Sequence, residues 1–490
     1  MQLRPYQLKL ANKTIKAFKK HGPGAGVMIQ AVTGSGKTVI GGAIALWAQS
    51  QLDGHSHGWL THRQELHDQS SNSLAKMGVR VVSMRKHKPA DRKWRKDVFN
   101  IVTPQMKRFP QFRSPGLLIV DEAHHIPAAS WAKLVSQWQQ SGGLVLGLTA
   151  TPWRMSRQQG FTDWFHTLIV GPKAKYLQDK GYLATPHIVS PDETKIDYTN
   201  AKVMSTGDYA YDWMNESISM LLAHKPVVQH WRKHTTNLID NRTMWFVPTV
   251  HCAHELHRRL VSDGDTASVL TAETPTSDRR KILAALKYKR LTHLISVDVL
   301  GEGIDVPTVP IMASLRPTKS LVIWRQQCGR VSRPKNERGG SCLILDYARN
   351  VERHGPPDLD IDWSLKPRAK RPSNLTMEIT ARCYSPECRD IFLHPAEREC
   401  WRCKQPQYFT CTECHVDRRW TKYTKRGTAC SICRKALEDK KSERRKIDQK
   451  KLDSAINYYK AKRYRGIAIK PYKRRQKQDQ LVLFNNKKGK

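Results

Sequence analysis

The sequence predicts two α/β domains in tandem, each built on a parallel sheet, followed by a small cysteine-rich module and a basic tail. Three observations predict this order. Apolar runs alternate with helical stretches through about residue 350, eight of the eleven cysteines lie within 383–433, and Lys and Arg dominate 434–490. The predicted divisions are a first α/β domain (1–190), a linker or insertion (191–219), a second α/β domain (220–352), a linker (353–380), the cysteine module (381–434) and the tail (435–490).

Continuous apolar runs mark the predicted strands, because the strands of a parallel sheet are buried on both faces. In the first domain each run is followed by a polar motif at its C-terminal end, where open α/β sheets bind ligands. The predicted strands are Val27–Ile29, Leu117–Val120, Leu144–Leu148, Met244–Val247, Leu294–Val297 and Leu343–Leu345, and Ser277–Tyr288 is a predicted helix.

The formal net charge is +41 at pH 7. Such an excess attracts polyanions through counterion release and long-range steering. Nucleic acid is the first candidate partner, and an acidic membrane surface is the alternative. No apolar run approaches the ~18 residues that cross a bilayer. Met1–Tyr6 lacks the charged-then-apolar pattern of a signal peptide. We therefore expect a soluble, intracellular protein with no membrane partner.

A phosphate-binding loop is predicted at Ala31–Thr38, Ala-Val-Thr-Gly-Ser-Gly-Lys-Thr, between an apolar strand and a helix. The glycines let the backbone wrap around phosphates, the lysine adds positive charge, and the threonine hydroxyl can ligate Mg²⁺. An ordinary glycine-rich turn is the alternative. The predicted ligands are Gly34, Ser35, Gly36, Lys37 and Thr38.

The acidic sequence Asp121-Glu-Ala-His124 follows the apolar run Leu117–Val120. Asp121 at the strand end can hold Mg²⁺, and Glu122 is placed to polarise an attacking water. An acidic turn without catalytic function is common at strand ends, but the phosphate-binding loop upstream favours the catalytic interpretation. His124 could couple this site to the second domain.

The second domain carries Gln326-Gln-Cys-Gly-Arg-Val-Ser-Arg333. Helical i, i+3 spacing would place Arg330 and Arg333 on one face. Their guanidinium groups match phosphate oxygens, although a solvated basic helix is the alternative. With Gln326, these arginines predict ATP hydrolysis in a cleft between the two domains, tied to domain closure.

In this order, the motifs resemble those of superfamily 2 helicases over about residues 1–350. The resemblance implies two RecA-like domains and a nucleic-acid-dependent ATPase that uses ATP and Mg²⁺. Residues Arg4-Pro-Tyr-Gln7 resemble the adenine-reading element, with Gln7 as the base contact. Val297–Pro307 resembles motif V of this family. The resemblance implies that the backbone of Gly303 approaches the bound ligand and that Asp305 contacts the ATP sugar.

The resemblance also implies where nucleic acid binds. Two strand-end loops resemble those that grip the nucleic-acid backbone, and a third resembles the motif linking hydrolysis to nucleic-acid binding. Thr-rich turns of no special function are the alternative for each, so the interpretation depends on their order. The implied residues are Thr61, Arg63, Thr103, Gln105, Thr149 and Thr151.

Within the superfamily, Ala313–Ser320, Cys342–Tyr347 and the cysteine region resemble RadD-type bacterial helicases. The chain departs from that group in two features: its acidic motif reads Asp121-Glu-Ala-His124 (DEAH), and its C-terminus is shorter and more basic. The resemblance implies a cytoplasmic DNA helicase or translocase of replication, recombination or repair, in a bacterial cell or phage-infected host. Its substrate would be single-stranded or branched DNA. The alternatives are an RNA helicase, a restriction-type motor subunit and a non-catalytic nucleic-acid scaffold.

The clustered cysteines form two sets of two close pairs each, the spacing of zinc-ribbon knuckles. We expect two structural Zn²⁺ ions, with an iron–sulfur cluster as the minority alternative. Neighbouring aromatic and Arg residues could stack on bases, or the module could be purely structural. The two sets are Cys383, Cys388, Cys400 and Cys403, then Cys411, Cys414, Cys430 and Cys433.

Near the end of the basic tail lies one apolar run, Gln480-Leu-Val-Leu-Phe484. It resembles the pentapeptide by which bacterial DNA-processing proteins bind the replicative sliding clamp. The resemblance implies that Leu483 and Phe484 fill an apolar pocket on the clamp and that Gln480 is hydrogen-bonded at the edge of that pocket. Leu481 belongs to the same predicted peptide. A run that folds back on the protein is the alternative.

Overall fold

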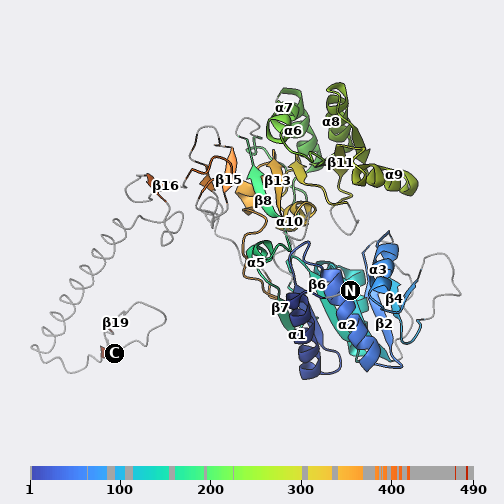
Figure 1. Cartoon of the computed structure of the whole chain (residues 1–490). Coiled ribbons are helices and arrows are strands. Elements are labelled where there is room, and N and C mark those ends of the chain that lie inside the picture. The colour runs from blue at the N-terminus through green and yellow to red at the C-terminus, as the bar shows by residue number, and fades with distance from the viewer. Residues whose placement is uncertain are drawn as a thin grey trace, which may run out of the picture. The chain divides into compact units, whose positions relative to one another are not determined.

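The chain forms two compact units, Met1–Gln407 and Tyr408–Lys490, in a computed structural model (Figure 1). The described residues are 3–62, 65–84, 94–104, 114–153, 160–191, 196–224, 226–300, 307–333, 340–367, 381–383, 385, 388, 390–393, 399–405, 408–410, 417–419, 469–470 and 482–483.

The first unit begins with a parallel seven-stranded sheet in the order β3-β4-β2-β5-β6-β1-β7. Its strands are β1 (Gly26–Gln30), β2 (Ser56–Leu60), β3 (Val81–Ser83), β4 (Phe99–Val102), β5 (Pro115–Asp121), β6 (Leu144–Thr149) and β7 (Thr167–Val170). The helices of this domain are α1 (Pro5–His21), α2 (Lys37–Gln51), α3 (Glu65–Lys76), the 3-10 turn η2 (Ala123–His125), α4 (Ala129–Gln140) and α5 (Ala174–Asp179).

The central strands of this sheet confirm the predictions made from continuous apolar runs. All five residues of β1 are buried, as are the five central residues of β5. Because β5, β6 and β1 are adjacent and parallel, their carboxyl ends meet at one edge of the sheet. This order brings together three motifs that are far apart in the sequence: the phosphate-binding loop, the acidic turn and the loop after β6.

A second sheet has eight strands in the order β10-β11-β9-β12-β13-β8-β15-β14, in which β15 pairs antiparallel with β8 and β14 pairs antiparallel with β15. Its strands are β8 (Thr185–Val189), β9 (Thr243–Val247), β10 (Ala267–Leu270), β11 (His293–Val297), β12 (Ile311–Ser314), β13 (Ser341–Asp346), β14 (Ala381–Arg382) and β15 (Ile391–Leu393). The accompanying helices are α6 (Tyr211–His224), α7 (Val227–Thr235), α8 (Val250–Ser262), α9 (Thr276–Lys287), α10 (Leu321–Gly329) and α11 (Asn350–His354).

Two strands of the second sheet come from parts of the sequence predicted to lie outside the second domain. β8 precedes the predicted boundary at residue 190, yet pairs in parallel with β13. β15, from the cysteine region, pairs antiparallel with β8 through Ile391 and Phe392. An apolar run shows that a strand is buried but not which sheet will bury it, so only the folded structure reveals these pairings.

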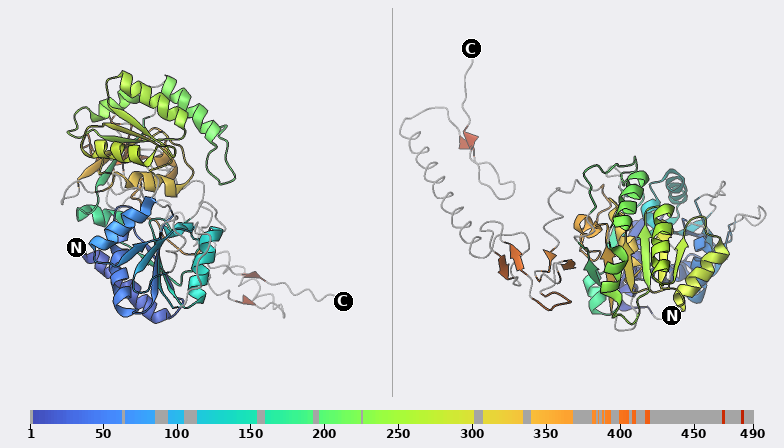
Figure 2. Two further views of the ribbon diagram at one scale, coloured as in Figure 1. Left: turned by 90° about the vertical axis from the view of Figure 1, so that its right-hand side faces the viewer. Right: turned by 90° about the horizontal axis from the view of Figure 1, so that it is seen from above.

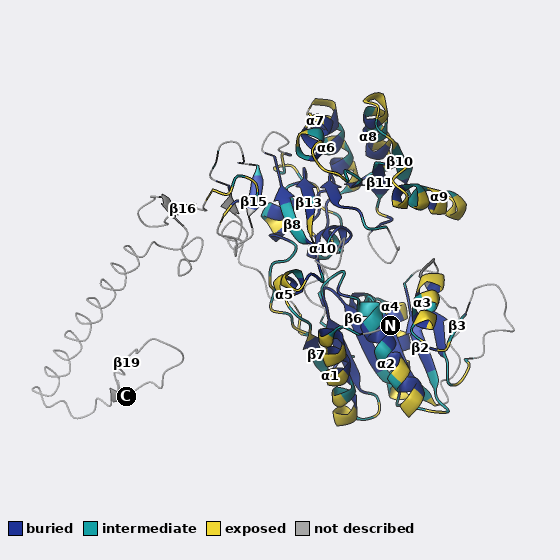
Figure 3. Cartoon of the chain, viewed as in Figure 1, coloured by how far each residue is buried: buried dark blue, intermediate teal, exposed yellow. Residues whose placement is uncertain are grey.

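Each sheet is covered by helices on both faces (Figure 2), and its central strands are buried while the outer helix faces are exposed (Figure 3). Two apolar clusters line the first sheet, and two line the second. Burial of this apolar area at roughly 25 cal/mol per Å² is the main source of each domain's stability. The two tandem α/β domains of the predicted fold class are therefore confirmed.

The second unit is described only at four short strands. β16 (Tyr408–Thr410) pairs antiparallel with β17 (Asp417–Arg419), and β18 (Ile469–Lys470) pairs antiparallel with β19 (Val482–Leu483). The charged helix expected near 435–465 lies outside the described residues. Across the part of the chain that the structure describes, no helix combines the length and apolar character needed to cross a membrane.

A buried carboxyl group at the end of β13 makes stability depend on pH. Asp346 is fully buried, and its Oδ2 accepts a hydrogen bond from the Val351 backbone N–H at 2.7 Å. Burial raises the pKa of Asp346 to about 7 from an ordinary 3.8. Between these values the folded state binds one more proton than the unfolded state. The contribution to stability is therefore greatest below pH 3.8 and declines until about pH 7.

Replacing Asp346 with Asn should remove this pH dependence, because the amide keeps the shape of the carboxyl group but does not titrate. The melting temperature of the wild type should drop more between pH 5 and pH 8 than that of the Asp346→Asn variant. Thermal unfolding of both proteins at the two pH values measures the difference. Equal drops would show that Asp346 does not titrate in this range.

Candidate functional site

The loop between β1 and α2 has the backbone conformation of a phosphate cradle. Gly34 and Gly36 have positive φ angles of 85° and 81°. Residues other than glycine adopt such angles only at a cost in free energy. Gly36 is the N-cap of α2, so the first backbone N–H groups of that helix point out beyond it. A Cβ on Gly36 would also lie 2.6 Å from Gln7 Nε2. The loop and helix end thus form an anion-binding site, with Lys37 on the first helical turn.

The N-terminal element Arg4–Gln7 is attached directly to this loop. Gln7 Nε2 donates a hydrogen bond to the Ser35 carbonyl oxygen at 3.2 Å, and the Arg4 N–H donates to Gln7 Oε1 at 3.0 Å. The Arg4 guanidinium carbon lies 4.3 Å from the centre of the Tyr182 ring. Sequence reasoning missed Tyr182, which no motif marks. The predicted adenine contact of Gln7 remains a prediction.

The acidic turn after β5 faces the lysine of the loop. Lys37 Nζ lies 3.6 Å from Glu122 Oε1, and both side chains are mostly buried. Glu122 has a φ of 51°, a strained conformation that turns the chain sharply after the strand. Asp121 Oδ1 accepts a hydrogen bond from the Glu122 N–H at 3.1 Å. The predicted lysine and carboxylates therefore meet at one end of the sheet.

His124 extends this cluster to the loop after β6. Its Nδ1 lies 3.5 Å from Glu122 Oε2 and 3.2 Å from Thr149 Oγ1. Thr149 Oγ1 also accepts a hydrogen bond from the Thr151 N–H at 3.1 Å. A continuous set of contacts thus runs Lys37–Glu122–His124–Thr149–Thr151. These contacts all lie within the first domain, whereas His124 was expected to couple the site to the second.

Two buried hydroxyl oxygens of this cluster, Ser35 Oγ and Thr151 Oγ1, have no hydrogen-bond partner among the described residues, and Glu122 Oε2 has only its ion-pair contact with His124 at 3.5 Å. Buried polar atoms are nearly always hydrogen-bonded, so these oxygens are available to a bound polar ligand or to water. A nucleoside triphosphate with Mg²⁺ and its water would supply both donors and acceptors here. Thr38, on the first turn of α2, and Asp121 are the residues that could hold Mg²⁺. The residues present fit ATP and Mg²⁺.

The second domain reaches the phosphate loop through α10. A Cβ on Gly329 would lie 2.2 Å from Thr33 Cγ2, so the helix end contacts the loop directly. A Cβ on Gly34 would lie 4.0 Å from Arg333 Cγ. Gln326 and Arg330 are buried, with 7% and 9% of their surface exposed. The arginine motif therefore lies against the phosphate loop, and its predicted contact with phosphate remains a prediction.

The helical spacing predicted for the two arginines is not observed. α10 ends at Gly329, Arg330 is its C-cap, and Arg333 lies beyond the helix. Packing of the helix end against Thr33 ends the helix earlier than the residue pattern suggested.

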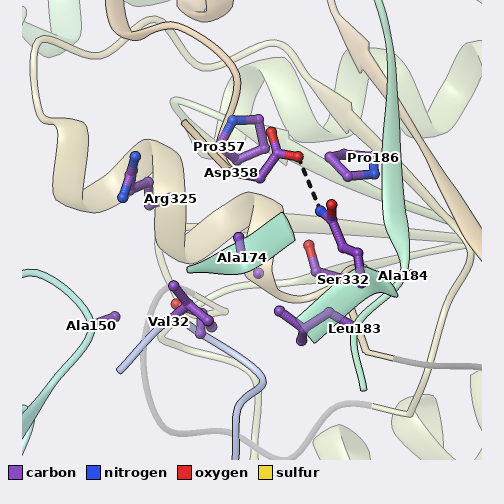
Figure 4. A pocket seen from close by; sticks show the side chains of 13 residues that line it. Val32, Ala150, Ala174, Leu183, Ala184, Pro186, Arg325, Ser332, Pro357 and Asp358 are labelled. Atoms are coloured by element: carbon purple, nitrogen blue, oxygen red, sulfur yellow. Dashed lines mark hydrogen bonds between the residues drawn. The ribbon is translucent and has the colours of Figure 1, made fainter. Parts of the chain in front are cut away.

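A small cavity of about 40 Å³ lies where the loop and α10 meet (Figure 4). This volume is enough for a few water molecules. Its lining comes from four parts of the chain: the first domain, the start of β8, α10 with the residues after it, and a segment after α11. Representative lining residues are Val32, Thr33, Ala150, Arg325, Gly329 and Asp358.

The residues expected to contact nucleic acid lie at or after strand ends. Thr61 follows β2, and Thr103 follows β4. Both are buried, with 0% and 9% of their surface exposed. Thr149 and Thr151 belong to the cluster around His124 described above. Arg63 and Gln105, together with Gly303 and Asp305 of the second domain, lie outside the described residues. Nucleic-acid contact remains a prediction for all of these threonines.

The first set of cysteines forms one four-thiol cluster, with all four sulfur atoms within 4.8 Å of one another. Cys383 Sγ and Cys403 Sγ lie 3.5 Å apart, close to the edge of about 3.8 Å in a tetrahedron with Zn–S bonds of about 2.3 Å. Burial raises the pKa of Cys388 to about 12, so a bound cation would have to stabilise its thiolate. The donor set fits Zn²⁺. Cys411, Cys414, Cys430 and Cys433 lie outside the described residues.

A network that sequence reasoning missed holds this cluster against α7. Asp390 Oδ2 lies 3.1 Å from His234 Nε2 and 3.4 Å from His230 Nε2. Arg402 Nη1 lies 3.2 Å from His234 Nδ1, and Tyr347 Oη lies 3.2 Å from His230 Nδ1. Every ring nitrogen has a hydrogen-bond partner, so the network is complete without a metal ion. The one signal in the sequence is the spacing of the two histidines, one helical turn apart.

Of the C-terminal run predicted to bind a sliding clamp, Gln480, Leu481 and Phe484 lie outside the described residues. Leu483 is described only as part of the backbone of β19. The clamp contact therefore remains a prediction.

A phosphate loop, an acidic turn and an adjoining arginine segment from a second domain define a nucleotide-hydrolysing α/β protein. The family model described as "Type III restriction enzyme, res subunit" matches residues 1–154, and "Helicase conserved C-terminal domain" matches residues 227–335. A 51.5 kDa protein of a Lactococcus phage is 30% identical over 336 residues, which cover 69% of this chain and 68% of that protein.

The putative ATP-dependent helicase IRC3 of Saccharomyces cerevisiae is 23% identical over 364 residues, 70% of this chain and 51% of the yeast protein. The chain thus spans about half the length of that relative. The solved Hef helicase domain of Pyrococcus furiosus is 16% identical, with a TM-score of 0.44, and covers 71% of this chain and 95% of that one. The chain belongs to the superfamily 2 helicases. Membership implies a nucleic-acid-dependent ATPase that uses ATP and Mg²⁺.

The close approach of Gly329 to Thr33 can be tested by adding a side chain at residue 329. In a Gly329→Ala variant the added methyl group must push α10 away from the phosphate loop, because it would lie 2.2 Å from Thr33 Cγ2. Displacing the arginines by a fraction of an ångström should lower the ATPase kcat by about tenfold or more. Steady-state hydrolysis assays measure the effect.

A second substitution provides the control. Thr33→Gly removes the side chain that the new methyl group meets, so the double variant should recover part of the activity lost by Gly329→Ala. Wild-type turnover in Gly329→Ala would show that this close approach is not needed.

Proposed function

We propose that the protein is an ATP-driven DNA helicase or translocase, which couples hydrolysis between its two RecA-like domains to movement on DNA or its remodelling. The observation that carries this proposal is that an arginine segment of the second domain packs against Thr33 and Gly34 of the loop whose Lys37 pairs with Glu122. A net charge of +41 supports a polyanionic substrate.

Each residue of the site has a proposed role. Lys37 neutralises charge on the terminal phosphates, and Glu122 orients and polarises the attacking water. Arg330 and Arg333, supported by Gln326, contact the transferring phosphoryl group, where such arginines contribute about 10³–10⁵ in rate. Thr38 and Asp121 hold Mg²⁺. On the sequence alone, Arg4 and Gln7 would contact the adenine, and Gly303 and Asp305 the ATP sugar.

Movement along nucleic acid requires that ATP hydrolysis change the contacts between the protein and the nucleic acid. His124 connects Glu122 to Thr149, so loss of the terminal phosphate would change the contacts of the loop after β6. That loop is one of the proposed nucleic-acid elements, with those containing Thr61, Arg63, Thr103 and Gln105. The chain of contacts supplies a physical route from the phosphate to the proposed track.

DNA is proposed as the track, and replication, recombination or repair as the setting, because Ala313–Ser320, Cys342–Tyr347 and the cysteine region resemble RadD-type helicases. The chain departs from that group in its DEAH sequence. An RNA helicase would share the same motor. A restriction-type motor subunit is favoured by the family model that matches the first domain. Stimulation of hydrolysis by different nucleic acids separates DNA from RNA.

The four-thiol cluster is proposed to bind a structural Zn²⁺, supported by its tetrahedral spacing. A second Zn²⁺ at Cys411, Cys414, Cys430 and Cys433 rests on sequence spacing alone. The sliding-clamp contact at residues 480–484 likewise rests on sequence alone.

Two substitutions test the hydrolysis site. Lys37→Ala should abolish tight ATP binding, because it removes the cation that faces the phosphates. Glu122→Gln should keep ATP binding but lower turnover by about 10² or more, since the water loses its polarising carboxylate. Binding of a fluorescent ATP analogue and hydrolysis with single-stranded, duplex, forked and four-way DNA, and with RNA, measure both effects.

The exposed substitutions Lys13→Ala and Glu216→Gln change the same charges away from the site and should leave both measurements unchanged. Normal hydrolysis by either site variant would overturn the site assignment. Stimulation by RNA but not by any DNA would overturn DNA as the track.

The zinc proposal predicts a change in metal content. Cys400→Ser should lower the zinc bound per chain by about one equivalent, because a three-thiolate site holds the ion weakly. Elemental analysis of the purified full chain measures the loss. Cys252→Ser is the matched control, since Cys252 is a buried thiol outside the cluster. Equal zinc in the Cys400→Ser variant and the wild type would refute the site, and visible absorbance with bound iron would indicate an iron–sulfur cluster.

A further inference from the structure

The segment Gly355–Pro367, here called the strap, follows α11 and has no helix or strand. The sequence predicted a linker here. The structure instead shows that the strap makes specific contacts with both α/β domains.

On the second domain the strap is fixed to α10. Trp324 Nε1 donates a hydrogen bond to the Gly355 carbonyl oxygen at 3.1 Å, and Arg325 donates one to the Leu359 carbonyl oxygen. Ile361 packs against the apolar cluster that contains Trp324. Trp324 and Arg325 are both buried in α10, the helix that leads to the arginine motif.

On the first domain the strap is fixed at two places. Gln178 Nε2 of α5 donates a hydrogen bond to Asp358 Oδ2 at 3.0 Å (Figure 4). Further along, the Phe161 N–H donates to the Leu365 carbonyl oxygen at 2.7 Å. The approach is close: a Cβ on Gly160 would lie 2.6 Å from that same oxygen. The side chain of Leu365 packs against the apolar cluster that contains Phe161.

Between these anchors, Trp363 joins the two halves of the motor. Its ring centre lies 4.6 Å from that of Trp153, and the Arg325 guanidinium carbon lies 5.5 Å from the Trp363 ring centre. Trp153 belongs to the loop after β6, where its N–H donates to the Thr151 carbonyl oxygen at 2.7 Å. One aromatic side chain thus contacts both the Thr149–Trp153 loop and the arginine helix.

We propose that Trp363 is a positioning residue for ATP hydrolysis. Through Arg325, the strap holds α10, and with it Arg330 and Arg333, at a set position relative to the phosphate loop and the Thr149–Trp153 loop. This inference rests on the proposed motor function and deepens it. It names the contact by which the nucleic-acid-sensing loop and the arginines respond to each other.

The second domain does not need Trp363 to form α10. Ser320 caps that helix, its side chain accepting a hydrogen bond from the Ile323 N–H, and Trp324 is fully buried within the domain. Removing the Trp363 ring should therefore loosen the placement of the helix rather than unfold it. The expected defect is in turnover, not in binding of either ligand.

The test compares Trp363→Ala, Trp363→Phe and the wild-type full chain, with Lys366→Ala as the matched control at an exposed strap position. With saturating nucleic acid, Trp363→Ala should lower the ATPase kcat by about tenfold. The KM for ATP, the affinity for the nucleic acid and the melting temperature should stay near wild-type values. Trp363→Phe keeps an aromatic face for Arg325 and Trp153, so it should recover most of the loss.

An unchanged kcat in Trp363→Ala, with the wild type stimulated, would overturn the positioning role and leave the proposed motor intact. A wild-type protein that no nucleic acid stimulates would instead refute the proposed function. Should Trp363→Ala fail to fold, Gln178→Ala tests the same strap by removing the donor to Asp358. It should lower the stimulated kcat by about threefold or more, and an unchanged value would overturn the proposal.

Discussion

The approach of Gly329 to Thr33 is the contact on which the site depends. Each domain by itself holds only part of the chemistry, since the lysine and carboxylates belong to the first sheet and the arginines to the second. Only a residue without a side chain lets α10 reach the phosphate loop, because a Cβ there would lie 2.2 Å from Thr33 Cγ2. Whatever moves α10 relative to the loop therefore moves the arginine segment relative to Lys37 and Glu122, and in the proposed function it would change the charge around the transferring phosphate.

Three kinds of interaction set that position. Apolar burial makes each sheet a rigid body, so the loops at the carboxyl ends of β1, β5 and β6 keep their spacing. Within the first body, the contacts from Lys37 through His124 to Thr149 tie the phosphate site to the loop after β6. Across the two bodies, the strap joins that loop to α10 through Trp363. In the proposed function, loss of the terminal phosphate and binding of nucleic acid would thus both alter the contacts of the same few side chains.

The cysteine cluster belongs to this arrangement more closely than its composition suggested. β15 extends the second sheet beside β8, and Asp390 binds two histidines of α7. A metal ion at the four thiols would therefore stabilise an edge of the second domain. The folding of that edge and of the second domain is linked through the pairing of β15 with β8 and through the partly buried carboxylate of Asp390.

Much of the site could be predicted from sequence because its chemistry is local. Gly34, Gly36 and Lys37 are close neighbours, and Asp121 and Glu122 directly follow a continuous apolar run, so the pattern alone indicated that they would lie at the end of the first sheet. The end of α10 was misjudged, since i, i+3 spacing carries no information about what the helix packs against. Tyr182, Asp390 and Trp363 were missed for the same reason: each gains its role from residues distant in sequence.

The sequence by itself determined the class of fold, the phosphate loop, the carboxylates and the arginine segment, because short-range patterns of burial and charge dictate them. The tertiary structure decided which strands share a sheet, where α10 stops, and how the strap joins the two domains. Those outcomes depend on which apolar surfaces, distant in sequence, pack against each other and exclude water. The residues next to a side chain in the sequence do not show which residues it will contact in the folded protein.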